Sequence, residues 1–148
     1  MKRMTLGLAV AAILMGASST ASAQVINNVC WNVNSFGVKG SLTVAGSASG
    51  TTIYDFDGFG TSSSVPIKGT LTIPPTGNIR FSFLIEAASP GQNAVTHELS
   101  LNRSTLNGTG NWRWFDGSNT GASTATFVNC ATVDESVGGD SASQGLKE

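Results

Sequence analysis

His97 is the only histidine of the chain, and it is the side chain best suited to acid–base chemistry or to orienting a ligand. It shares strand parity with Val95 and Leu99, so the alternation predicts that it lies on the inner face of a sheet. A polar side chain directed into a small barrel can orient a bound molecule. We expect His97 to sit at the end of its strand, near the mouth, where it is solvated or hydrogen-bonded. Arg103 has the same parity.

The tryptophans are the second group of side chains suited to binding a ligand. Trp112 and Trp114 share one face of a predicted strand, and Arg113 and Phe115 share the other face. Indole rings stack well on apolar or aromatic ligands and on sugar rings, but they are also large core fillers. The predicted ligand-binding set therefore consists of Trp112, Trp114, Phe81, Phe83 and His97. The alternative is that these side chains fill a solid core.

Catalytic and metal-binding patterns are weak. Asp55 and Asp57 lie two residues apart on one strand face, about 6.6 Å from one another, whereas glycosidase carboxyls approach a substrate from opposite sides. The sequence contains no G-x-S-x-G motif, and residues 55–60 do not complete an EF-hand loop. We therefore predict no catalytic residue, no metal and no cofactor. Residues 55–60 are expected to be a strand that ends in a solvated turn.

Cys30 and Cys130 bracket almost the whole predicted fold. Two cysteines without a C-x-x-C motif and a single histidine make a poor zinc site. An even number of cysteines in an exported protein favours a disulfide. The bond would bring the first and last strands within about 7 Å, measured between the two Cα atoms.

The first 23 residues resemble a secretory signal peptide of bacterial type. Lys2 and Arg3 give the positive start, residues 6–15 form the apolar segment, and Ala21-Ser22-Ala23 fits the cleavage site. We expect an exported protein, periplasmic or extracellular, with a β-barrel domain over residues 24–133. Residues 134–148 are predicted to be a flexible acidic tail, because they are rich in Ser and Gly and poor in apolar residues.

The charge of the chain is low. Charged residues make up 11% of the sequence, against about 25% in typical globular domains. Nucleic acid is excluded as a partner, because phosphate binding needs clustered Lys and Arg. The segment between the cysteines carries five basic and five acidic residues, so it is neutral overall. This composition favours a shape-defined interior or a neutral surface.

Period-two alternation dominates the chain and predicts antiparallel strands. Eight strands are expected, at 28–34, 37–45, 51–57, 65–73, 79–87, 95–103, 110–115 and 122–131, separated by turns that include residues 107–111. VKGSLTV at 38–44 matches IKGTLTI at 67–73, and TGNIRF at 76–81 matches TGNWRW at 109–114. These similarities are explained either by a repeated hairpin or by convergence on a few residue types.

An all-β meander with its ends tied together has two good solutions. It can close into an up-and-down β-barrel, which leaves no free edge, or fold into a two-sheet sandwich; the disulfide favours the barrel. In architecture such a barrel is similar to lipocalin and avidin barrels, although no motif of either family lies at matching positions. The outward positions are polar, which argues against a membrane-integral barrel.

Three functions are compatible with this sequence. The first is the binding of a small hydrophobic or aromatic molecule inside the barrel. The second is a non-enzymatic structural or interaction subunit of a periplasmic or extracellular assembly, for which oligomerisation is an option. The third is a barrel isomerase or cyclase, which requires His97, Arg103 or a carboxylate to converge in a pocket with a perturbed pKa.

Overall fold

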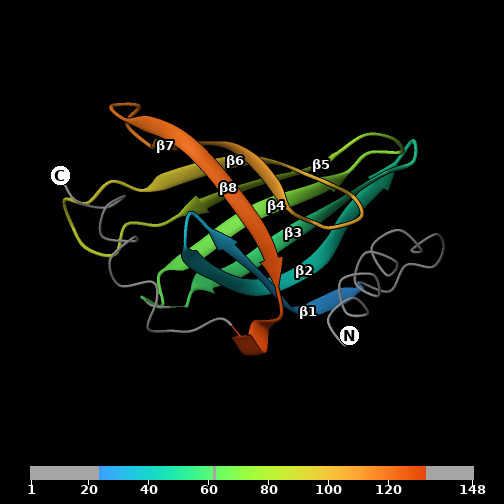
Figure 1. Ribbon diagram of the computed structural model, residues 1–148, viewed down its shortest axis with the longest axis horizontal. Helices are drawn as coiled ribbons and strands as arrows, with labels where there is room; N and C mark the ends of the chain where they lie inside the picture. The colour runs from blue at the N-terminus through green and yellow to red at the C-terminus, as the bar shows by residue number, and fades with distance from the viewer. Residues whose placement is uncertain (1–23, 62, 133–148) are drawn as a thin grey trace.

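The computed structural model describes residues 24–61 and 63–132, and this part of the chain forms a closed antiparallel barrel (Figure 1). Each strand pairs with its neighbours in sequence, and the last strand pairs with the first. The strands are β1 (Val25–Val33), β2 (Phe36–Ala48), β3 (Thr51–Gly60), β4 (Pro66–Ile73), β5 (Ile79–Ile85), β6 (Val95–Leu101), β7 (Gly108–Trp114) and β8 (Thr120–Val128). A short 3₁₀ turn, η1 (Cys130–Thr132), follows. The predicted closed meander is confirmed. The predicted signal peptide (residues 1–23) and the predicted acidic tail (residues 134–148) lie outside the described residues.

Two boundaries differ from the sequence-based expectation because glycines lie inside strands. β3 continues to Gly60 instead of ending in a solvated turn, and β7 begins at Gly108, within the segment predicted as a turn. A Cβ atom at position 60 would lie 2.2 Å from the Phe36 ring, so this glycine makes room for an aromatic side chain. The chain turns earlier, before β7, where Leu106 adopts a positive φ of 58°.

Only one of the two sequence similarities is also a structural one. VKGSLTV and IKGTLTI lie in β2 and β4, which flank β3 on its two sides. In contrast, residues 76–78 form a turn in which Gly77 has a φ of +83°, whereas residues 109–111 lie inside β7. The shared TGN sequence thus occurs in two unrelated conformations.

The core consists of the inward-facing residues of all eight strands. Its centre is an aromatic cluster in which the ring centroid of Phe81 lies 4.9 Å from that of Trp31, 5.2 Å from that of Phe56 and 4.8 Å from that of Phe83. Charged residues such as Lys68 and Asp57 lie outside, where their side chains form an exposed ion pair of 3.0 Å. The alternation of the sequence is therefore the alternation between core and surface.

One end of the barrel, which we call the Leu106 end, carries the connections β2–β3, β4–β5 and β6–β7. Leu106 folds inward from the β6–β7 connection and is 1% exposed, and its carbonyl accepts a hydrogen bond of 3.0 Å from Trp31 Nε1. The Arg103 guanidinium donates to the backbone carbonyls of Pro74 and Gly77 in the β4–β5 turn. Arg103 therefore joins two connections and does not line the interior with His97.

The other end, which we call the Trp112 end, carries the connections β1–β2, β3–β4, β5–β6 and β7–β8. The β1–β8 pairing runs only from Cys30 opposite Val128 to Val33 opposite Ala125. Beyond it, the side chain of Asn34 bonds to the backbone of β8, accepting from Thr124 N at 2.8 Å and donating to Ala122 O at 3.2 Å. The first residues of β8 thus extend past the β1–β2 turn.

The predicted disulfide is present. Cys30 in β1 and Cys130 in η1 are bonded, and their Cα atoms lie 5.2 Å apart. This distance agrees with the geometric requirement derived from the sequence. The bond joins β1 to the turn that follows β8, on the side of the Leu106 end, because β8 runs toward that end.

Candidate functional site

All five residues of the predicted ligand-binding set face the interior, on three adjacent strands. Phe81 and Phe83 belong to β5, His97 to β6, and Trp112 and Trp114 to β7. Phe83 lies opposite His97, and His97 lies opposite Trp112, so these three form one row across the sheet. The two phenylalanines and His97 are buried, whereas the two tryptophans are half-buried and pack against the core.

His97 is buried in the middle of the row, whereas the expected position was near the mouth; of the two expected states, solvated or hydrogen-bonded, the structure has the second. Its ring stacks on that of Phe83, with centroids 4.8 Å apart and planes at 11°. Its Nδ1 forms a hydrogen bond of 2.7 Å with the hydroxyl of Ser123 in β8. Ser123 was not among the predicted site residues, although it shares strand parity with Ala125, which is also buried.

Gly110 allows this contact between two strands that are not neighbours. It lies in β7 between β6 and β8, opposite Leu99 on one side and Ser123 on the other. A Cβ atom at position 110 would be 1.8 Å from the carbonyl oxygen of Glu98, so only glycine fits. With no side chain in between, the imidazole of His97 reaches Ser123 across β7.

Burial determines the protonation state of His97. Removal of the ring from water lowers the pKa of His97 to about 4, because the charged form loses its hydration. The imidazole is therefore neutral at pH 7. A neutral imidazole has one nitrogen that donates and one that accepts. Since Nδ1 is bonded to Ser123, Nε2 has the complementary role.

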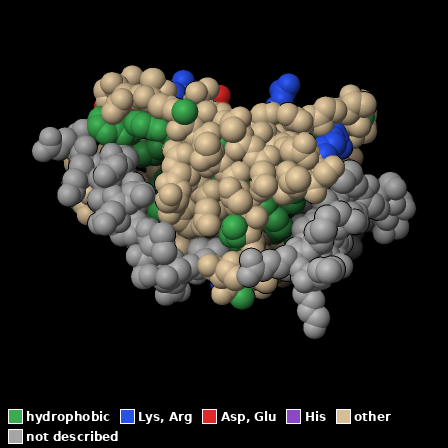
Figure 2. Space-filling view, in the orientation of Figure 1, with side chains coloured by type: hydrophobic (Ala, Val, Ile, Leu, Met, Phe, Trp, Pro, Cys, Tyr) green, Lys and Arg blue, Asp and Glu red, His purple; other side chains and the backbone are tan. Residues whose placement is uncertain are grey.

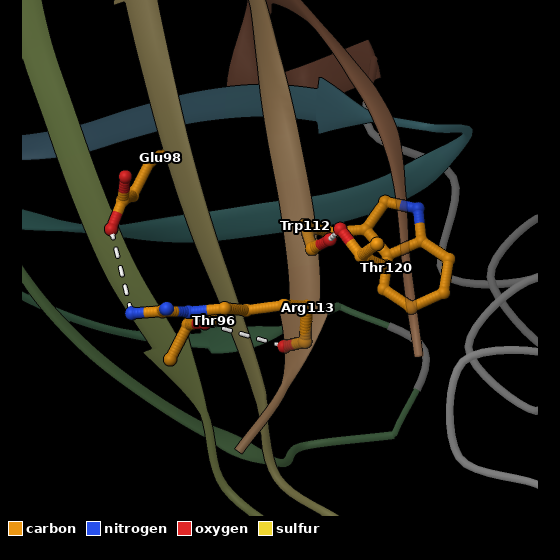
Figure 3. A network of polar contacts seen from close by, with 5 residues as sticks. All are labelled: Thr96, Glu98, Trp112, Arg113 and Thr120. Atoms are coloured by element: carbon orange, nitrogen blue, oxygen red, sulfur yellow. Dashed lines mark hydrogen bonds and ion pairs between the residues drawn. The ribbon is translucent and has the colours of Figure 1, made fainter. Parts of the chain in front are cut away.

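Trp112 is positioned by glycine on the inside and by polar contacts on the outside. Its indole covers Gly121 of β8, where an added Cβ atom would lie 2.6 Å from Nε1. Its carbonyl accepts a hydrogen bond of 2.7 Å from Thr120 Oγ1 (Figure 3). In the next residue, Arg113, the guanidinium nitrogen Nη2 lies 3.8 Å from Glu98 Oε1. The backbone carbonyl of Arg113 accepts a hydrogen bond of 3.2 Å from Thr96 Oγ1. These outward contacts hold β7 between its neighbours.

Hydrophobic side chains reach the surface near the tip of the β7–β8 hairpin. Figure 2 shows a hydrophobic area at the upper left of this face, in the region of that tip in Figure 1. Phe115, the residue after β7, is 75% exposed and points outward, as its parity predicts. Its backbone N–H donates to Ala94 O at 2.8 Å, which ties the β7–β8 and β5–β6 connections together.

The interior offers neutral hydrogen bonding and no charge. Among the described residues, His97 and Ser123 are the fully buried polar residues apart from Tyr54, and the side-chain oxygens Thr61 Oγ1 and Gln92 Oε1 are buried as well. Arg103 lies at the opposite end, and Asp55 and Asp57 are exposed on β3. The convergence of groups that an isomerase or cyclase requires is thus not found in this part of the chain. The described ranges also contain no group of three or more His, Cys, Asp and Glu residues suited to a metal ion.

Helices contribute little to the described part of the chain, and none there is long and apolar enough to cross a membrane. Comparison with protein-family models, with curated proteins and with solved structures finds no match to this chain.

Proposed function

We propose that this chain is an exported protein, periplasmic or extracellular, that binds a small apolar or aromatic molecule at the Trp112 end of its barrel. The observation that carries the proposal is the exposure of inward-facing aromatic rings at this end. Trp112 and Trp114 face the interior yet are half-buried, while Phe81 and Phe83 behind them are buried. A ring that remains partly wet gains free energy when an apolar ligand covers it.

The surrounding strands support this site. His97 and Phe83 continue the row of Trp112 into the core, so a ligand that stacks on Trp112 also meets ordered side chains. The indole of Trp112 packs directly on Gly121, which fixes the position of the ring, and β8 extends here beyond the β1–β2 turn. Sites built on strands hold their side chains more firmly than sites built on loops.

A fluorescence titration with N-phenyl-1-naphthylamine, a neutral probe that emits in apolar sites, tests the proposal. The wild-type protein should bind the probe, and the double variant Trp112→Ala/Trp114→Ala should bind it at least about tenfold more weakly, because the stacking surface is removed. Phe115→Ala is the matched control, since this ring is adjacent in sequence but points outward. The circular dichroism of each variant reports that the barrel is folded.

Absence of probe binding to the folded wild type would overturn the proposal, as would an equal loss of binding in Phe115→Ala. Equal loss would instead favour a subunit of an assembly, for which the exposed Phe115, Val25 and Phe59 are the observations in support. Native mass spectrometry of the exported protein separates the two readings, because a retained small molecule and a defined oligomer differ in mass.

A further inference from the structure

We infer that the first half of β8, residues 120–124, is a gate that the side chain of Asn34 holds shut, and that a ligand reaches Trp112 through this gate. This inference rests on the proposed function and specifies how its site opens. It follows from the way in which the edge of β8 is held, from the small side chains on the inner face of this segment, and from the indole ring that lies behind it.

The first step concerns an interruption of the barrel wall at the Trp112 end. The junctions β2–β3, β4–β5 and β6–β7 stay bonded as far as the connections. Their last backbone hydrogen bonds run from Thr61 N to Gly37 O at 2.8 Å, from Glu86 N to Pro66 O at 3.1 Å and from Phe115 N to Ala94 O at 2.8 Å. The junction of β8 with β1 differs, because its strand pairing ends at Ala125 opposite Val33. Residues 120–124 therefore form a sheet edge within the described barrel.

The second step concerns Asn34, whose side chain takes the place of the missing strand. Its Oδ1 accepts from Thr124 N at 2.8 Å and from Thr124 Oγ1 at 3.3 Å, and its Nδ2 donates to Ala122 O at 3.2 Å. Its backbone N–H donates to Thr124 O at 3.0 Å. Asn34 is exposed, so water can replace the bonds of its side chain, and the release of this edge costs little free energy.

The third step concerns the inner face of the gate, which anchors it weakly. Gly121 and Ser123 are its inward residues, and the hydroxyl of Ser123 bonds to His97 Nδ1 at 2.7 Å. The hydrophobic core of the described chain includes Ala125 and packs against Phe127, both in the second half of β8, but it contains no residue of 120–124. Opening of the gate therefore withdraws no large apolar side chain from the core.

The fourth step concerns what lies behind the gate. Gly121 is opposite Trp112, and a Cβ atom added to it would lie 2.6 Å from the indole Nε1. β7 is paired with β6 along its whole length, from Trp114 opposite Val95 to Gly108 opposite Leu101. A movement of residues 120–124 away from β7 would thus uncover the indole of Trp112 while β6 holds β7 in place.

Amide hydrogen exchange, measured by NMR on the ligand-free protein, tests the opening itself. Asn34→Gly removes the side chain without straining the turn, because position 34 has a φ of 49°, which glycine adopts readily. The N–H of Thr124 faces Asn34, so the N–H groups of Gly121 and Ser123 face β7, since successive residues of a strand point to opposite sides. We expect these two amides to exchange about tenfold faster in the variant, which corresponds to the loss of the side-chain hydrogen bonds.

Binding kinetics connect the gate to the ligand. Stopped-flow fluorescence with N-phenyl-1-naphthylamine should show that Asn34→Gly raises the association and the dissociation rate constant by the same factor, about tenfold, and leaves the Kd unchanged, because the gate is closed both with and without the probe. Asn34→Asp keeps an acceptor for Thr124 N but loses the donor to Ala122 O, so both rate constants should rise in this variant as well. The matched control is Asn78→Ala, which removes an exposed side chain that donates to Ser100 Oγ at the Leu106 end, and its exchange and binding rates should equal those of the wild type.

The outcomes distinguish the two proposals. If the folded wild type does not bind the probe, the proposed function and this inference both fail. If it binds, but with the same rate constants in the wild type and in Asn34→Gly, the ligand-binding function stands and the gate is overturned. Faster exchange at Thr124 alone would overturn the gate as well, because this amide loses its own partner in the variant. Equal acceleration at Phe56 in β3 would do the same, since it would reflect a loss of stability of the whole barrel.

Discussion

The Leu106 end and the Trp112 end of this barrel are built from the same alternating strands but finish differently. At the Leu106 end, one apolar residue of a connection folds inward, and the carbonyl behind it accepts the indole N–H of Trp31. At the Trp112 end, the connections at 86–94 and 115–119 consist mainly of Gly, Ser, Asn, Asp and Ala, and the large apolar residue Phe115 points outward. The β3–β4 connection of this end does place an apolar residue, Val65, in the core, so the difference from the Leu106 end lies in the β5–β6 and β7–β8 connections, which bury no residue fully.

Under the proposed function, this difference separates the residues that stabilise the fold from the residues that bind the ligand. The buried atoms of Trp31, Leu101 and Leu106 contribute their full transfer free energy to folding. Trp112 and Trp114 contribute only part of their transfer free energy to folding, because their rings remain partly hydrated. Changes at the Leu106 end should therefore mainly affect the free energy of unfolding, and changes at the Trp112 end should mainly affect ligand affinity.

The largest effect on stability is expected from the disulfide, which closes the barrel on the side of the Leu106 end. Cys30→Ser/Cys130→Ser releases a loop of 100 residues in the unfolded chain and should lower the free energy of unfolding by about 4–5 kcal/mol. Urea denaturation measures this loss, and the wild type under reducing conditions should match the variant. A change below about 1 kcal/mol would mean that the strand pairing alone holds β1 to β8.

A direct comparison of the two ends comes from Leu106→Ala and Trp114→Phe. The first removes a fully buried side chain and should cost about 3 kcal/mol of unfolding free energy, whereas the second trims a half-buried ring and should cost about 1 kcal/mol or less. Acrylamide quenching of Trp31 should also increase in Leu106→Ala. Equal losses in the two variants would contradict the division between a stabilising end and a binding end.

His97, which lies between the two ends, should make the free energy of unfolding depend on pH. Its pKa is about 4 in the folded protein and about 6.5 in the unfolded chain, so the unfolded chain takes up a proton first as the pH falls. The contribution of neutral His97 to the free energy of unfolding is therefore fully present above pH 6.5, and about 3 kcal/mol of it is lost as the pH falls to about 4. His97→Phe should lose this dependence, while the titration of the carboxylates remains in both proteins. Parallel pH profiles of the two proteins would show that His97 is not desolvated.

Alternation and the cysteine pair favoured the closed barrel over the sandwich, because the inward positions of a small barrel are mostly apolar and the disulfide requires the two ends to meet. The inward set Trp112, Trp114, Phe81, Phe83 and His97 also followed from parity alone. Two things did not follow. Glycines in β3 and β7 look like turn residues, since the sequence does not show the aromatic ring or the neighbouring backbone that requires them. Arg103 has inward parity, but its strand ends before it, at Leu101.

The contact between His97 and Ser123 was unpredictable for a further reason. It joins β6 to β8 across β7, and it depends on the close approach of backbones at Gly110. Pairwise alternation describes neighbouring strands only, so it cannot indicate which polar residues meet across a third strand. The signal that could have found Ser123 is the combination of inward parity in β8 with a glycine opposite it in β7.

The smallest expected effect concerns a polar atom deep in the core and has the opposite sign. The hydroxyl of Tyr54 is buried and has no hydrogen-bond partner among the described residues, and burial raises the pKa of this phenol. Tyr54→Phe removes the unpaired group and should raise the free energy of unfolding by about 1 kcal/mol in urea denaturation. Trp31→Phe is the informative counterpart, because it removes an indole N–H that is paired with Leu106 O and should destabilise the protein. Destabilisation by Tyr54→Phe would reveal a partner for the phenol, and the interior would then hold a second polar site besides His97 and Ser123.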